Sequence, residues 1–124
     1  MNREKFERSV VDAIEALPDE FLSRLENVDV VVEDRPTIRQ LVRAGIRRGQ
    51  TLLGLYEGVP QTKRGRGYGL VLPDKITIFQ KPIESRCAND AQIVAQVEKV
   101  LRHEIAHHFG INDARLREIE SGGH

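Results

Sequence analysis

The order of apolar and polar positions predicts a chain in which helices and strands are interspersed. Apolar residues that return every three or four positions indicate amphipathic helices, and a Pro or Gly after such a run indicates its end. The longest run begins after Asn89 and Gln92, a helix-start capping pair, and ends at Gly110. The other predicted helices are Asn2–Leu17, Asp19–Leu25, a basic helix from Ile38 that stops at Gly49, and Asp113–Ile119.

Three short runs rich in β-branched residues predict strands. They are Val28–Val32, Thr51–Tyr56 and Lys75–Lys81. Gly54 weakens the second run and Pro82 ends the third. The segment Gly58–Asp74 between them is rich in glycine and proline, which predicts a long mobile loop.

Length and composition limit the class of protein. A chain of 124 residues, 40% of them hydrophobic, fits one domain over residues 1–124 and is too short for two separate cores. Cys87 is the single cysteine, which excludes a disulfide scaffold and is typical of a reducing compartment. No apolar run reaches the roughly 18 residues of a membrane span, and the charged N-terminus does not resemble a signal peptide. We therefore expect a single cytoplasmic domain.

Charge is balanced over the whole chain, with 19 basic and 19 acidic residues, but it is not balanced along it. Arg35–Tyr68 holds eight basic residues and one acidic residue, so this part carries +7 and the remainder −7. Within it, Arg39, Arg43 and Arg47 line one side of the basic helix and could hold an acidic partner or nucleic acid. The alternative is a solvated face that pairs with the acidic remainder. Because no nucleic-acid motif is matched, we expect no nucleic-acid partner.

The long helix carries the pattern H-E-x-x-H, with His103, Glu104 and His107. The two histidines are one turn apart, about 40° around the helix, so both imidazoles can grip one metal ion. Glu104 lies between this flank and the apolar stripe, where it can stand over the ion. His108 points in another direction, which favours a core or supporting role. The alternative is that the histidines only satisfy a helix surface and that Glu104 pairs with Arg102 or a neighbour.

A catalytic zinc usually has three protein ligands and one open position. Gly110 can reverse the chain directly after the helix and return Asp113 toward the ion. Asp113, or Asn112 beside it, could instead cap the final helix, so both roles remain open. Glu118 and Glu120 are weaker candidates, because a further helical turn would have to fold back.

The segment HEIAHHFGIND, His103–Asp113, resembles the H-E-x-x-H-x-x-G-x-x-D signature of small single-domain zincin-like metallopeptidases from bacteria. VVVEDRP, LLGLYEGVP and ITIFQKPI resemble the strand segments of that family in the same order. The resemblance implies an α+β fold, with a small mixed sheet of three to four strands packed against a long active-site helix and shorter helices. It implies that His103, His107 and Asp113 bind Zn²⁺. Glu104 would be the general base in the hydrolysis of peptide bonds.

The chain departs from the larger metzincins in two ways. They have a His where Asp113 stands and a Met-containing turn beneath the metal, whereas the single Met here is Met1. An aspartate ligand adds negative charge, so bound water is less acidic and we expect weak or latent activity. Tyr56 and Tyr68 are candidate donors to the developing oxyanion, with core or loop packing as the alternative. Lys75–Lys81 is the candidate edge strand for a bound peptide.

Two further function classes stay open. A metal-binding domain with little or no turnover could act as an adaptor or a latent enzyme, with Gly58–Asp74 covering the cleft. A binder of acidic partners or nucleic acid would use the basic region Arg35–Tyr68. We expect a peptide or protein substrate and no membrane partner, and the sequence does not indicate the oligomeric state.

Overall fold

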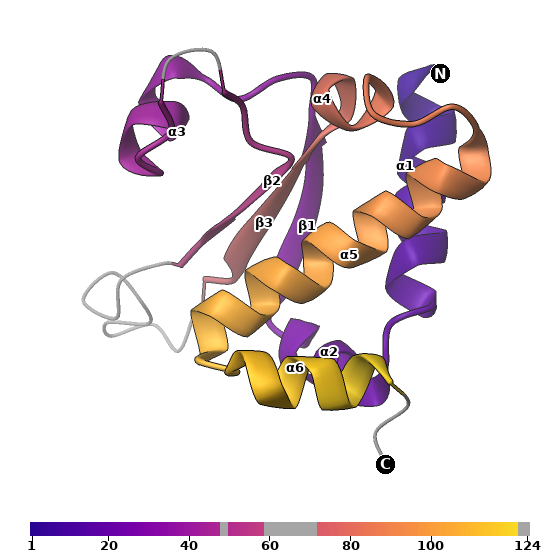
Figure 1. The fold of residues 1–124 in the computed structure, drawn as a ribbon. Helices are drawn as coiled ribbons and strands as arrows, with labels where there is room; N and C mark the ends of the chain where they lie inside the picture. The colour runs from indigo at the N-terminus through magenta and orange to yellow at the C-terminus, as the bar shows by residue number, and fades with distance from the viewer. Residues whose placement is uncertain (48–49, 59–71, 122–124) are drawn as a thin grey trace.

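A three-stranded mixed sheet forms the centre of the fold (Figure 1). The computed structural model describes residues 1–47, 50–58 and 72–121. The strand order is β1-β3-β2, with β1 parallel and β2 antiparallel to the central strand. The strands are β1 (Val28–Glu33), β2 (Gly54–Glu57) and β3 (Asp74–Phe79). The sheet and its helices confirm the expected α+β class with a mixed sheet.

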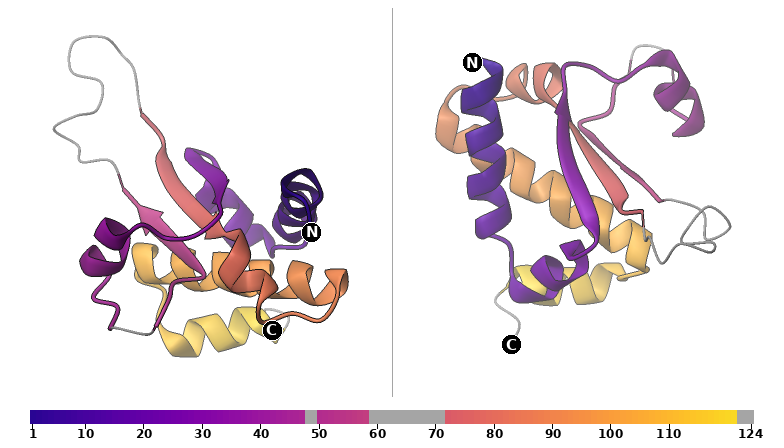
Figure 2. Two further views of the ribbon diagram at one scale, coloured as in Figure 1. Left: turned by 90° about the horizontal axis from the view of Figure 1, so that it is seen from above. Right: turned by 180° about the vertical axis from the view of Figure 1, so that it is seen from behind.

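The long helix α5 (Asp90–Phe109) crosses one face of the sheet, and α1 (Arg3–Glu15) packs against α5 beside β1 (Figures 1 and 2). Cross-strand register places Val30, Ile76 and Tyr56 in one row on the covered face. Within the described residues, no helix lies over the opposite face (Figure 2). The buried cluster between sheet and helices comes from several elements and includes Phe6, Val10, Phe21, Ile76, Ile78, Val97, Leu101 and Ile105.

The N-terminal half of the chain follows the apolar pattern closely. The expected second helix is α2 (Asp19–Leu22), and the chain tightens into the 3₁₀ turn η1 (Ser23–Leu25) over its last residues. The basic helix α3 (Ile38–Arg43) begins at a capping box of Thr37 and Gln40. Its end differs from the prediction: the chain turns at Gly45, whose φ of +70° suits glycine, and the predicted stop at Gly49 lies outside the described residues.

The third predicted strand is corrected in two respects. It ends at Phe79, and a short helix α4 (Gln80–Glu84) follows; Pro82 is tolerated there because the first turn of a helix needs no partner for its N–H. The prediction that this strand is an edge is wrong, because β3 pairs with strands on both sides. Thr77 and Phe79, on the face without a helix, are 1% and 0% exposed. The edges of the sheet are β1 and β2.

The C-terminal helix α6 (Asp113–Glu120) folds back beneath α5 (Figure 1). It supplies Ile119 to the buried cluster. The predicted loop 58–74 lies outside the described residues for most of its length, so its proposed role as a cover for the cleft remains a prediction. None of the helices in the described part of the chain is long and apolar enough to span a membrane.

Candidate metal centre

The helix that carries the H-E-x-x-H pattern is fixed at both ends by local hydrogen bonds. At its start, the Asn89 side chain accepts from the N–H of Gln92, as the capping pair predicts. At its end, Gly110 has φ +71° and ψ +27°, the left-handed conformation. The N–H groups of Gly110 and Ile111 both donate to the carbonyl of Ala106. This closure satisfies a terminal carbonyl and turns the chain toward α6.

The two histidines lie on the solvent side of the last two turns of α5, and the glutamate between them lies inside. His103 and His107 are exposed, whereas Glu104 is only partly exposed. The flanking Ile105 and Ala106 are buried in the core. The apolar stripe of the helix therefore fixes its rotation, so that two imidazoles face outward one turn apart.

Glu104 is anchored to the edge strand β2. Its Oε1 accepts a hydrogen bond of 2.9 Å from the backbone N–H of Tyr56. Burial raises the pKa of Glu104 above its ordinary value, against the lowering effects of the Tyr56 N–H and of the two neighbouring histidines. A carboxylate with a raised pKa is a stronger base at neutral pH, which suits proton abstraction.

Tyr56 joins three elements at this point. Its hydroxyl donates to Asp74 Oδ2 at 2.8 Å, and its ring stacks on His108 with a centroid distance of 3.8 Å and an interplanar angle of 13°. The ring of Phe109 stands edge-on to both. The hydroxyl of Tyr56 thus already donates its hydrogen to Asp74, so its role as an oxyanion donor remains a prediction. The other predicted donor, Tyr68, lies outside the described residues.

The cap of α6 is Asn112, whose side chain accepts from the N–H of Arg115 at 2.8 Å. Asp113 is the first helical residue, so the capping role that competed with metal binding belongs to its neighbour. The side chain of Asp113 lies outside the described part of the structure, and its role as a ligand stays a prediction.

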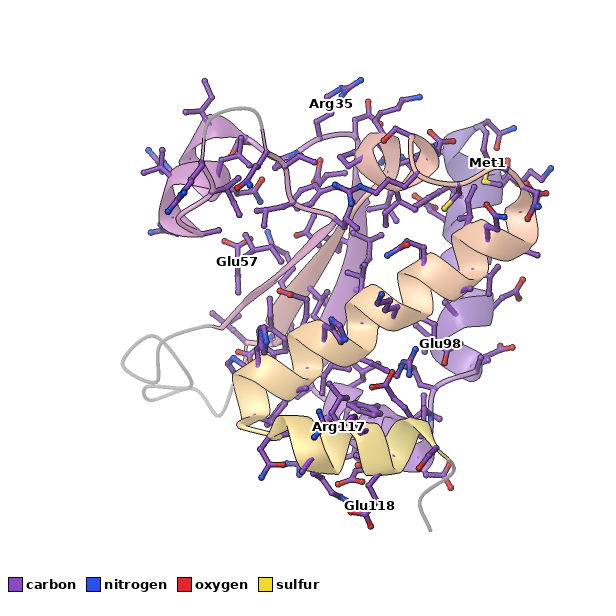
Figure 3. The ribbon with its side chains drawn as sticks, viewed as in Figure 1. Met1, Arg35, Glu57, Glu98, Arg117 and Glu118 are labelled. Carbon is purple, nitrogen blue, oxygen red and sulfur yellow. The ribbon has the colours of Figure 1, made fainter. Side chains whose placement is uncertain are left out.

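The weaker ligand candidates are engaged elsewhere. Glu120 pairs with Arg102 at 2.7 Å, and Glu118 pairs with Arg115 at 3.1 Å. Glu118 lies on the side of α6 away from α5 (Figure 3). Arg102 also contacts Glu98, so its ion pairs do not involve Glu104. The alternative that Glu104 pairs with Arg102 is therefore wrong.

Among side chains that the structure describes, no group of three or more His, Cys, Asp or Glu could hold a metal. The described metal-binding candidates are the two imidazoles, whereas a catalytic zinc usually has three protein ligands. The chemistry of the pair fits zinc, because imidazole nitrogen is a common zinc ligand and the two side chains reach one point in solvent. A carboxylate at the start of α6 would complete the set.

A groove runs from this site along α5. It has a volume of about 420 Å³ and is bounded on one side by the chain entering β2, on the other by α5. His103 and Glu104 are among its lining residues, together with Lys99 and Arg86. Gly54 lets the two walls approach, because a Cβ there would stand 2.4 Å from Val100 Cγ1.

Sequence reasoning missed the contribution of β2 and of Asp74. The bond from Tyr56 to Glu104 uses a backbone N–H, which every residue except proline has, so no residue type signals it. Asp74 was placed at the end of a loop, although it begins β3 and accepts the Tyr56 hydroxyl. The signal that could have been used was Tyr56 itself: a tyrosine in a strand has an apolar ring to pack and a hydroxyl that needs a partner.

Comparisons with known proteins identify a family and a similar fold. A family model described as zincin-like metallopeptidase matches residues 25–123. Among solved structures, a conserved hypothetical protein from Thermus thermophilus is similar with a TM-score of 0.55 and 23% sequence identity, over 88% of this chain and 94% of that chain. At this identity the structural match shows the fold alone. Among curated proteins, none matches the chain.

Proposed function

Because the chain belongs to the zincin-like metallopeptidase family, we propose that it is a zinc-dependent peptidase. The metal is held by His103, His107 and Asp113. Glu104 is the general base. The observation that carries this assignment is the placement of Glu104, half-buried and held by β2, between two outward imidazoles on α5. Zinc, when bound, supplies a Lewis acid that polarises the scissile carbonyl and makes water acidic near neutral pH.

The protein's own part in the reaction is proton transfer. One oxygen of Glu104 accepts from Tyr56, which fixes the plane of the carboxylate and leaves Oε2 to take a proton from the attacking water. The same proton passes to the amide nitrogen as the C–N bond breaks, so the carboxylate is regenerated. The raised pKa of Glu104 favours the first step, the abstraction of the proton.

The edge strand beside the site is β2, and we assign peptide binding to it. Leu53 pairs with Phe79 through a backbone hydrogen bond, so alternate residues of the strand, Gly54 and Tyr56, turn their backbone groups away from β3. The Tyr56 N–H is used by Glu104, which leaves the Gly54 N–H and the carbonyls of both residues for a peptide. An extended peptide that adds to this edge lies along α5 and passes the two histidines. Strand β2 therefore replaces β3 as the strand proposed to bind the substrate.

Substitution of the general base tests the assignment. Glu104→Gln keeps the acceptor for the Tyr56 N–H but cannot take a proton, so we expect full zinc binding and a loss of hydrolysis of at least about 100-fold. Zinc content by mass spectrometry and cleavage of a peptide library, with and without chelator, measure the two properties. Retained cleavage in this variant would remove Glu104 as the base. A wild-type protein that binds zinc but cleaves no peptide would instead be a metal-binding protein without turnover.

The third ligand is tested by a matched pair of carboxylates on α6. We expect Asp113→Ala to weaken zinc binding by more than about tenfold, because it removes one of three ligands. Glu118→Ala is the control, since Glu118 pairs with Arg115 on the far side of the helix. Competition with a chromogenic zinc chelator gives both affinities. Equal affinities would assign the third position to water or to another residue.

A further inference from the structure

The groove beside the metal centre continues past it along α5. A second hollow of about 310 Å³ adjoins the first, and the two share Arg86, Gln96 and Lys99 as lining residues. The first hollow reaches Glu104 and His103, and the second extends away from them. A single channel therefore leads from the proposed general base to a pair of cationic side chains.

Helix geometry places Lys99 in line with the metal-binding face. Counted at about 100° per residue, Gln92, Gln96, Lys99 and His103 fall within about 60° of one another around α5. Lys99 stands one turn before His103. The opposite side of the channel is the Thr51–Gly54 segment that enters β2, the strand to which peptide binding is assigned. A side chain of a peptide on β2 would project toward Lys99.

The charges of the channel are of one sign apart from Glu104. Within the described residues, neither Arg86 nor Lys99 takes part in an ion pair, although most other arginines and lysines of the helices around the core do. Glu104 is the single carboxylate among the lining residues, and its Oε1 is held by the Tyr56 N–H. Nothing described in the channel neutralises its two cations.

We propose that this channel binds a carboxylate of the peptide substrate, so that the enzyme prefers substrates with an acidic group on the Arg86 and Lys99 side of the cleaved bond. The carboxylate can be an Asp or Glu side chain or a free C-terminus. The inference rests on the proposed peptidase function for its location, while the binding of a carboxylate can be measured without turnover. Because both cations are exposed, the preference is moderate and weakens with salt.

Peptide binding to Glu104→Gln is the test, since this variant keeps the cleft and does not consume the peptide. The probes are fluorescein-labelled octapeptides of three kinds: one Glu with a blocked C-terminus, Gln in its place with a blocked C-terminus, and Gln with a free C-terminus. The Glu or Gln is moved through each position in turn, and anisotropy gives the dissociation constants. We expect a carboxylate to improve binding by roughly tenfold at one position.

Charge removal provides the control. In the same background, Lys99→Gln with Arg86→Gln should bring the acidic and neutral peptides to equal affinity, and Lys75→Gln should not, because Lys75 lies on the sheet face away from α5. Preference for the blocked Glu peptide identifies a side chain as the ligand, and preference for the free C-terminus identifies the terminal carboxylate.

Equal binding of all three peptides to the unaltered channel, or a preference that survives the double substitution, overturns the proposal. These outcomes test the carboxylate site and do not test the proposed peptidase activity. A wild-type protein that cleaves peptides without regard to charge refutes only the carboxylate site. One that binds acidic peptides selectively and cleaves none refutes only the peptidase.

Discussion

At the scale of single residues, Tyr56 connects α5 to the sheet. Its backbone N–H holds Glu104, its hydroxyl bonds to Asp74 and its ring packs on His108. These three contacts use three different parts of one residue. The sequence indicated Tyr56 as a candidate hydrogen-bond donor, and the structure shows that its hydroxyl donates to Asp74 at the start of β3.

Tyr56→Phe separates an anchoring role from a role in transition-state stabilisation. The substitution keeps the stacked ring and the backbone N–H and removes the bond to Asp74, so we expect a loss of stability of about 1 kcal/mol and a loss of kcat below tenfold. Denaturant unfolding and steady-state kinetics measure these values. A fall in kcat of about 100-fold at unchanged stability would make the hydroxyl an oxyanion donor instead.

The relative placement of the three H-E-x-x-H residues was predictable because they lie within one helix. His103, Glu104 and His107 are close in sequence, and helical periodicity alone orients them. The bond between Tyr56 and Glu104 joins positions 48 apart in the chain. Such a contact depends on how strand and helix dock, which local patterns do not determine.

At the scale of elements, the close approach of α5 and β2 allows the hydrogen bond between Glu104 and the Tyr56 N–H. Gly54 lies under Val100, and Thr77 O is 3.2 Å from the position a Cβ would occupy. The glycine that weakened the strand in the sequence therefore has a packing reason.

Gly54→Ala tests this close approach. We expect a loss of about 1–3 kcal/mol in stability and a loss of activity, because β2 must move away from α5 and carry the Tyr56 N–H from Glu104. Thermal unfolding and peptide cleavage would report both. Val100→Ala removes the atom that the new methyl group meets, so the double variant should recover part of each loss. If Gly54→Ala is as stable and active as wild type, the tight contact is not required.

Element positions were largely predictable, and element pairing was not. The long helix is found from Asp90 to Phe109, within a residue of its predicted ends. The error concerned β3, which was predicted as an edge strand and is the central strand of the sheet. Its polar Thr77 is nonetheless buried, because β1 and β2 flank it from distant parts of the chain. Single-sequence patterns record alternation but not the neighbours on either side.

At the scale of the whole molecule, an ion pair joins the start of the chain to the middle. The α-ammonium of Met1 lies 3.0 Å from Glu84 Oε2, with exposed fractions of 5% and 17% for the two side chains. Burial would raise the pKa of Glu84, but hydrogen bonds from the α-ammonium and from Gln80, together with the positive charge, hold this pKa below its ordinary value of 4.5.

The pH dependence of stability follows from this lowered pKa. Between the folded and unfolded pKa values the unfolded chain binds more protons, so Glu84 stabilises the fold fully above about pH 4.5 and this contribution is lost as the pH falls through the folded value. Glu84→Gln should therefore melt at a lower temperature than wild type at pH 7, and the difference should shrink as the pH falls below 4.5. Melting curves across this range, with exposed Glu26→Gln as control, check the direction. A difference that persists unchanged at pH 3 would assign the effect to packing.

Helix α1 packs into the same core as α5. The family match starts at residue 25, yet Phe6, Val10 and Phe21 are buried in the same cluster as the helix that carries the histidines. Each large apolar side chain buried there contributes about 1.5–3 kcal/mol, and a typical fold has only about 5–15 kcal/mol in total. A chain trimmed to the matched region would leave one side of α5 in water. Helix α1 is therefore part of the same core as α5, although the family match begins after it.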